Sequence, residues 1–416
     1  MLSVPPPFHD RIRFLSELSR RLHLAGVSSS RLEGAVRSVA TSIGARCEIW
    51  STPTGILMSL SDATLPNGTQ ETRVMRLEPG EINLGALAKL DAIAEQVVNG
   101  TLSLDAAWDA MLALDSPTTV KQQLATVSAF GLAAASVAGL LSTGWIDIAV
   151  AGSIGLLIGW IALLTRTRPH LGAAFEAVAA IVATTLATAF AHFVAPLSLQ
   201  TVIVAALIVL MPGLSLTTAV SELAAQQLVT GTARFAGAMT VLLKLTFGSV
   251  AASQLMLALG WAPLAGTPES LPSQVEIVAT IAAALSFAVL FRAQRRDVLL
   301  VMASAILGYV LTRVGSAWFG SVASGTFAGA VFFSSLTMGA LSNLYGRVWN
   351  RPGALVRVPG IMLLVPGSVG FRALSFVMER DYALGFDTLV AVLSALLALV
   401  AGLLFGSLLI PPRRYL

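Results

Sequence analysis

The segment IVLMPGLSLTTAVSELAAQQLVTGTAR, residues 208–234, interrupts an apolar run with a Pro-Gly pair and continues as a hydroxyl-rich stretch. Proline removes a backbone donor and clashes with the preceding turn, so we expect a membrane helix to break at Pro212 and Gly213. A half-helix starting there would aim its free N–H groups and positive dipole end at a carboxylate. Three hydroxyl residues follow the break and could bind a polar side chain, or could simply bond back to the preceding helical turn: Ser215, Thr217 and Thr218.

A second Pro-Gly pair occurs 154 residues later, within VPGSVGFRALSFVMERDYALG at residues 365–385. Four residues coincide at this offset without a gap: Pro212 with Pro366, Gly213 with Gly367, Gly231 with Gly385, and Gly248 with Gly402. Ser368 follows the second break, and Arg372 could hold a carboxylate or extend to the outer membrane surface. Two broken segments predict a duplicated membrane unit with its substrate site where the breaks meet.

The composition is that of an integral membrane protein. Of 416 residues, 56% are apolar and only 12% are charged, against roughly 25% charged in a soluble domain. The net charge of +4 arises in the membrane part, and it gives no support for nucleic-acid binding. The single cysteine, Cys47, cannot form an internal disulfide, and the sequence has no Cys/His cluster and no Walker phosphate loop. We therefore expect no metal, no other cofactor and no direct use of ATP.

Ten apolar segments approach the ~20 residues that a bilayer core requires. They lie near 124–142, 146–164, 171–194, 198–220, 234–259, 275–291, 297–312, 318–341, 354–377 and 386–410. With the repeat offset they divide into two units of five, residues 121–260 and 275–412. An odd number per unit places the second unit upside down, as in the inverted repeats of secondary transporters. The ninth segment, rich in Pro-Gly pairs, could instead be re-entrant.

Residues 1–120 read as a small α/β domain. Amphipathic helices are expected near 11–24, 30–43, 83–98 and 103–114, with strands at 47–50, 56–60 and 73–77. Residues 30–33 form a capping-box pattern at the second helix. The N-terminus has no apolar core of signal-peptide length, so we expect this domain in the cytoplasm.

Arginines predict the orientation of the chain, because cytoplasmic loops of membrane proteins carry the basic excess. Ten fall on the side of the N-terminal domain: Arg166, Arg168, Arg234, Arg292, Arg295, Arg296, Arg347, Arg351, Arg413 and Arg414. Only Arg313 and Arg380 fall on the other side. Both termini are therefore expected in the cytoplasm.

Three charged residues within or near the spans are candidates for coupling transport to an ion gradient. Lys244 falls near the middle of the fifth span, where an ammonium group must face a partner or water. It could bind a substrate carboxylate, act as a charge switch with Glu222 or Glu176, or form a structural ion pair. The pairs Gly155/Gly159 and Gly325/Gly329 indicate close helix packing or a face for a homo-oligomer.

The sequence resembles the threonine/serine exporter family along nearly its whole length. Four pieces carry the resemblance: Leu22, Gly26, Arg31, Leu32 and Glu33 with Pro53, Thr54 and Gly55; Glu81–Leu84 with Leu87 and Leu90; MPGLSLTTAVSEL at 211–223 with GTARFAGA at 231–238; and LLVPGSVGFRAL at 363–374. The resemblance implies a bacterial inner-membrane protein with a cytoplasmic N-terminal domain and ten spans. It also implies export of small amino acids such as threonine and serine, driven by a proton or another ion gradient.

Three alternatives stay open, and one of them is a passive channel, through which transport would ignore a collapsed proton gradient. Relatives whose membrane parts are split between two chains are linked to organic-acid export, so a C4-dicarboxylate is an alternative substrate. A membrane-bound hydrolase is an alternative of another class, because the N-terminal domain contains residues that occur in hydrolase sites: His23, Glu33, Cys47, Thr54 and Asp62. No spacing among them sets a nucleophile beside a base, so we expect no enzyme activity.

Overall fold

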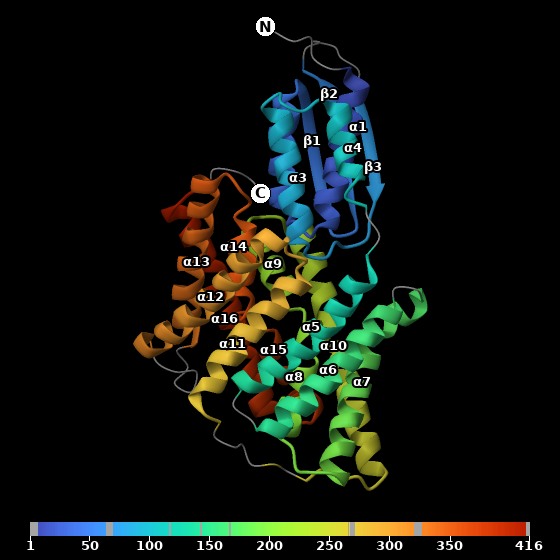
Figure 1. Cartoon of the computed structure of the whole chain (residues 1–416), viewed down its shortest axis with the longest axis vertical. Helices are drawn as coiled ribbons and strands as arrows, with labels where there is room; N and C mark the ends of the chain where they lie inside the picture. Colours follow the sequence, from blue (N-terminus) through green and yellow to red (C-terminus); the bar gives the residue numbers. More distant parts are fainter. Residues whose placement is uncertain are drawn as a thin grey trace.

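The computed structural model describes residues 7–63, 70–115, 118–141, 144–165, 168–264, 266, 271–319 and 327–412. An α/β domain stands at one end of a bundle of long helices (Figure 1). The domain consists of α1 (Phe8–Leu24), α2 (Ser29–Ser42), β1 (Ala45–Thr52), β2 (Gly55–Asp62), β3 (Gln70–Arg76), α3 (Leu84–Val98) and α4 (Leu104–Leu112). Its strands form an antiparallel sheet in the order β1-β2-β3, with Cys47 opposite Leu60 and Leu57 opposite Val74.

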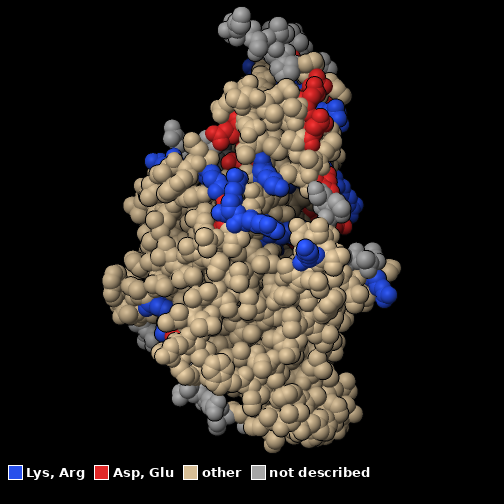
Figure 2. Space-filling view, in the orientation of Figure 1, with Lys and Arg blue, Asp and Glu red and all other residues tan. Residues whose placement is uncertain are grey.

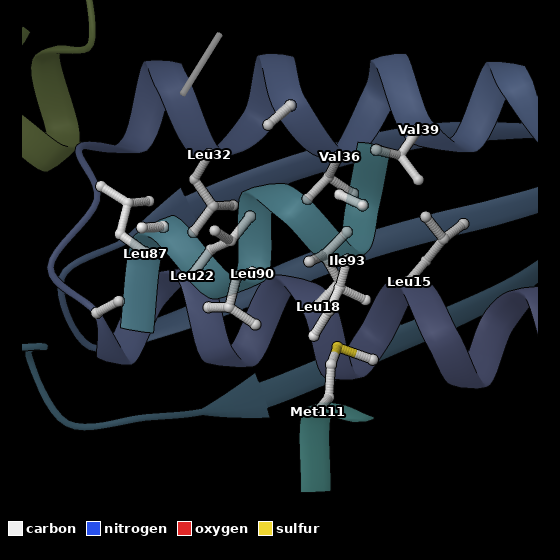
Figure 3. Close-up of a cluster of buried hydrophobic side chains, with 14 of the residues drawn as sticks. Leu15, Leu18, Leu22, Leu32, Val36, Val39, Leu87, Leu90, Ile93 and Met111 are labelled. Atoms are coloured by element: carbon white, nitrogen blue, oxygen red, sulfur yellow. The ribbon is translucent and has the colours of Figure 1, made fainter. Parts of the chain in front are cut away.

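The core of this domain comes from amphipathic helices that share one face of the sheet. Leu15, Leu18 and Leu22 of α1 lie against Leu32 of α2 and Leu90 of α3 (Figure 3), and all five are fully buried or nearly so. β1 alternates buried and exposed residues, as expected for a strand covered on one face. The capping box predicted at residues 30–33 does not form, because α2 begins at Ser29 and the Glu33 carboxylate accepts the Ser51 N–H at 2.9 Å instead.

The bundle contains two sets of helices. The first comprises α5 (Val120–Leu140), α6 (Trp145–Thr165), α7 (Pro169–Phe193), α8 (Leu199–Ala206), the 3-10 turn η1 (Ile208–Leu210), α9 (Gly213–Ala224) and α10 (Leu228–Ala258). The second comprises α11 (Ser273–Leu290), the 3-10 turn η2 (Arg295–Asp297), α12 (Val298–Phe319), α13 (Phe327–Trp349), α14 (Ala354–Met362), α15 (Gly367–Met378) and α16 (Tyr382–Leu409).

Eight helical segments are long and apolar enough to cross a membrane, and the bent pair α8 and α9 brings the number to as many as nine. That pair bends by 53°. Each span expected from the sequence overlaps a helix or broken helix, although residues 320–326 of the eighth lie outside the described residues. α13 is not among the segments that qualify. The structure thus establishes a polytopic helical protein, and the number ten stays a prediction.

Helix bounds recur at the offset found in the sequence. α9 begins at Gly213 and α15 at Gly367, 154 residues later, and both helices have 12 residues. Two residues beyond each helix the backbone is left-handed, with φ of 60° at Gln226 and 68° at Arg380. The contacts recur as well, because α10 packs on α7 and α9 just as α16 packs on α13 and α15.

The first helices of the two sets pack antiparallel. A Cβ atom on Gly139, near the end of α5, would lie 3.1 Å from the side chain of Ala279, near the start of α11. Across the two sets, α9 contacts α16 and α15 contacts α10. Of the two readings of the first small-residue pair, the structure confirms close helix packing: Gly155 and Gly159 pack against Ala134 and Phe130 of α5, inside the bundle. Gly325 of the second small-residue pair lies outside the described residues.

The α/β domain shares its core with the bundle. Leu84 and Leu87 belong to the same buried cluster as Phe287 and Phe291 at the end of α11, and the Leu84 N–H donates to the Phe291 carbonyl at 2.9 Å. Lys and Arg side chains gather where the domain meets the bundle, while most of the bundle face in view lacks charge (Figure 2). This distribution agrees with the arginine asymmetry of the sequence; Arg166, Arg413 and Arg414 lie outside the described residues.

Candidate functional site

The two Pro-Gly breaks meet in the middle of the bundle. At each break the glycine N–H donates to the carbonyl two residues earlier, from Gly213 to Met211 at 2.8 Å and from Gly367 to Val365 at 2.9 Å. Pro212 and Pro366 adopt nearly the same backbone angles, φ −81° with ψ 41° and 39°. Each break is therefore a tight three-residue turn from which a new helix starts.

The contact between the breaks is reciprocal. A Cβ atom on Gly367 would lie 3.1 Å from the Gly213 Cα and 3.4 Å from the Met211 Cβ. A Cβ atom on Gly213 would clash with the side chain of Val365. Met211 and Val365 are equivalent at the repeat offset, so each break presents the same positions to the other, as at a two-fold interface. Only glycine allows the two backbones to approach this closely.

Two cavities flank α9 on the side of the α/β domain. The first, of about 240 Å³, lies among α9, α13, α14, α16 and the domain, and we call it the α14 cavity. The second, of about 490 Å³, lies among α5, α6, α9, α11 and the domain, and we call it the α5 cavity. Thr218 lines both, Thr217 lines the α14 cavity, and Ser215 lines the α5 cavity. Of the three hydroxyl residues predicted after the first break, Ser215 and Thr218 thus border open space, whereas the Thr217 Oγ1 is itself buried.

The second break lines neither cavity. Pro366, Gly367, Ser368 and Arg372 are absent from both cavity walls, as are Pro212 and Gly213 at the first break. The Nε of Arg372 is buried and has no hydrogen-bond partner among the described residues. These two cavities therefore reach the first broken helix, from the domain side, and not the second.

Glu222 joins α9 to the α/β domain. Its side chain is 1% exposed and accepts from the Arg234 Nε at 2.9 Å and from the Ser29 N–H, in the first turn of α2, at 3.1 Å. A carboxylate at a helix N-terminus is stabilised by the free N–H groups and the helix dipole. Nearby, Thr230 donates to the Ser51 carbonyl at 3.0 Å. Glu222 thus sits in the contact between domain and bundle.

Lys244 pairs with Glu176, not with Glu222. The Lys244 Nζ lies 2.8 Å from the Ala173 carbonyl and 3.4 Å from Glu176 Oε2, between α10 and α7. Both side chains are partly exposed, 36% and 22%, and the neighbouring Leu243 and Phe247 point outward. Lys244 lines neither cavity, so this geometry favours a role for its charge over direct contact with substrate.

A family model described as "Putative threonine/serine exporter" matches residues 13–256, more than half of the chain, and a second, described as "Threonine/Serine exporter", matches residues 276–409. The chain belongs to the threonine/serine exporter family. The two matches include both Pro-Gly breaks, the α/β domain and the helices that line both cavities.

Individual relatives of this exporter family member are distant. A protein of Mycobacterium tuberculosis named "Probable threonine/serine exporter" is 26% identical over 98% of this chain and 78% of its own length. Two fungal proteins named "Pheromone-regulated membrane protein 10", from Pichia sorbitophila and Saccharomyces cerevisiae, are 23% and 24% identical over 89% and 86% of this chain. The chain spans only 38% and 46% of those fungal proteins. No solved structure matches the chain.

Three of the hydrolase candidates in the α/β domain make contacts within its fold. Asp62 pairs with Arg11 at 2.6 Å, and His23 Nε2 donates to the Glu78 carbonyl at 3.0 Å. Glu33 holds the Ser51 N–H, and burial raises the pKa of the Cys47 thiol to about 11. A thiol with a raised pKa is a poor nucleophile at neutral pH. The contacts of Asp62, His23 and Glu33 tie these three groups to different parts of the domain.

Sequence reasoning missed the two arginines in the α14 cavity. Arg31 comes from α2 of the α/β domain, and Arg357 comes from α14. Arg31 was visible only as part of the family resemblance, and Arg357 lies in the ninth apolar segment, which could be re-entrant. Their proximity depends on how the domain docks onto the bundle, which no spacing in the sequence encodes.

Proposed function

We propose that this protein is a secondary transporter that exports small amino acids, threonine and serine in particular, driven by a proton gradient. The single observation that carries the proposal is the reciprocal contact of the two Pro-Gly breaks, Gly213 against Gly367. Broken helices that meet near the midplane are typical of transporter substrate sites. The family membership supports the direction of transport and the class of substrate.

The proposed architecture is a pair of inverted repeats, residues 121–260 and 275–412, beside an α/β domain of residues 1–120. The recurring helix bounds, the antiparallel contact of α5 with α11 and the left-handed residues Gln226 and Arg380 support it. Five spans in each repeat would bring the total to ten. The arginine-rich side, with both termini, would face the cytoplasm of a bacterial inner membrane.

The proposed transport cycle is alternating access around the crossing. The α14 and α5 cavities lie on the domain side, where Ser215, Thr217 and Thr218 would bind substrate. In the outward-facing state the equivalent half-helix α15 would open, and Ser368 and Arg372 would contact the substrate there. This exchange explains why the Nε of Arg372 is buried without a hydrogen-bond partner among the described residues in this state.

Coupling is proposed to involve Lys244 and Glu176, with Glu222 transmitting the state of α9 to the α/β domain. Lys244 and Glu176 are close enough for the protonation of one to change the charge balance around the other. Because they lie outside both cavities, their role would be to bias the two states.

Export of a C4-dicarboxylate is the second candidate, and one observation favours it. The α14 cavity contains two arginines, Arg31 and Arg357, and two cations match two carboxylates better than one. Counterflow in proteoliposomes distinguishes the candidates: labelled threonine exchanges against internal threonine under the first, and labelled succinate against succinate under the second. Exchange of neither compound would contradict both.

A further inference from the structure

The charges around the α14 cavity do not balance. Its charged lining residues are Arg31, Arg357 and Glu222. Glu222 is already neutralised by Arg234 at 2.9 Å and by the Ser29 N–H. Among the described residues, neither the Arg31 guanidinium nor the Arg357 guanidinium has a hydrogen-bonding or ion-pair partner. Two cationic side chains therefore share one cavity without a counter-charge from the described part of the chain.

The α5 cavity provides a contrast within the same molecule. Its charged lining residues are Glu81, Arg234 and Arg292. Arg292 pairs with Glu81 at 3.7 Å, and Arg234 pairs with Glu222. Each arginine there has its carboxylate, so an excess of positive charge is not a general property of the junction between domain and bundle.

A buried hydroxyl in the α14 cavity also lacks a partner. Thr217 is 3% exposed, and its Oγ1 has no hydrogen-bond partner among the described residues. Thr218 and Ser221 lie beside it on the same wall of the cavity. A buried polar group without a partner costs free energy, and a bound ligand that accepts its hydrogen bond removes that cost.

We propose that the α14 cavity is a binding site for a small carboxylate, held by Arg31 of the α/β domain and Arg357 of α14, with Thr217 as a further donor. Guanidinium groups bind carboxylates through paired, charge-assisted hydrogen bonds. A cavity of about 240 Å³ is smaller than those that hold drug-sized molecules, and this size fits a compact ligand.

The proposal gives the α/β domain a direct part in ligand binding. Arg31 reaches the cavity from α2, the helix whose first turn is held by Glu222. The ligand would bridge domain and bundle, so its binding would favour the docked domain. This inference deepens the proposed function and rests on it for the choice between an amino acid and a dicarboxylate.

Binding to the purified full-length protein tests the site. Titration calorimetry with L-threonine and with succinate would compare wild type with Arg31→Gln, Arg357→Gln and Thr217→Val. Arg295→Gln is the control, because Arg295 is an exposed arginine on the same side of the bundle and lines neither cavity. We expect one of the two compounds to bind wild type and the control equally, and each cavity arginine variant to raise Kd at least tenfold.

The ligand-free melting temperature separates binding from folding. Neither arginine has a described partner to lose, so the ligand-free variants should melt at or above the wild-type temperature while binding weakly. A wild-type Kd in either arginine variant, or no binding of either compound to wild type, would overturn the proposal. Saturation by threonine identifies an amino-acid site, and saturation by succinate alone identifies a dicarboxylate site.

Transport measured with the same preparations distinguishes the proposed binding site from the proposed transporter function. Arginine-dependent binding without counterflow of either compound would leave the site standing and reject the transporter function. Counterflow of threonine, together with a Kd that is the same in wild type and in both arginine variants, would support the transporter function and reject the site.

Discussion

Gly213 and Gly367 lie back to back where the two broken helices cross, and a Cβ atom on Gly367 would lie 3.1 Å from the Gly213 Cα. Two backbones at this distance leave no room for side chains between them. In the proposed transport mechanism this crossing therefore constrains which residues fit at positions 213 and 367. Any movement of α9 relative to α15 must alter this contact.

A valine at position 367 should block transport. Its Cβ and methyl groups would collide with the backbone at Gly213, so we expect Gly367→Val to lower threonine counterflow at least tenfold in proteoliposomes. Gly237→Val is the matched control, because a Cβ atom on Gly237 of α10 meets nothing within 4 Å. Equal loss in both variants would indicate a general effect of valine on the bundle.

Removing the charge of Glu222 should loosen the α/β domain. Glu222→Gln weakens the bonds to Arg234 and Ser29, and a buried charge-assisted network of this kind contributes roughly 2 kcal/mol. We expect a lower Tm and faster amide hydrogen exchange at residues 25–31. Glu176→Gln serves as the control, since its pair with Lys244 is partly exposed and contributes about 1 kcal/mol or less. Unchanged exchange at 25–31 would contradict the docking role.

Lys244 should affect coupling more than substrate binding. It lines neither cavity, so we expect Lys244→Met to leave KM for threonine within about twofold, a change below ~0.5 kcal/mol. The acceleration of transport by a pH gradient should be lost. A tenfold rise in KM would instead indicate direct contact with substrate, and an intact response to the gradient would reduce the Lys244–Glu176 pair to a structural role.

His23 should make the α/β domain sensitive to acid. Burial lowers the pKa of His23 below its ordinary value of 6.5, and the ring donates to the Glu78 carbonyl. The unfolded chain then binds a proton more readily than the folded one, so stability is lost as the pH falls below 6.5. The Tm of wild type should fall more steeply between pH 7 and 5.5 than that of His23→Gln. The exposed His9 provides the control, since His9→Gln should retain the wild-type slope.

Local sequence patterns predicted most of the fold. Helical periodicity identified the helices of the α/β domain, and apolar length identified the long helices of the bundle. The Pro-Gly pairs predicted both breaks, because proline and glycine act on the backbone at their own positions. The offset that relates Pro212 to Pro366 also relates the bounds of α9 and α15.

Contacts between distant segments could not be predicted in the same way. The partner of Lys244 was left open between two carboxylates, and only the packing of α7 on α10 selects Glu176. Glu222 was considered for coupling, but docking of α2 places the Ser29 N–H against it. Arg31 and Arg357 come together because a domain folds back onto the bundle, and nothing in the local sequence specifies that approach.

Counterflow of labelled threonine, measured with and without an imposed pH gradient, tests the central claim most directly. The protein, reconstituted in proteoliposomes, should exchange external for internal threonine, and the gradient should accelerate net movement. Gly367→Val should abolish both. Absence of threonine exchange in the wild-type protein, with succinate exchanged instead, would contradict the assignment of an amino-acid exporter.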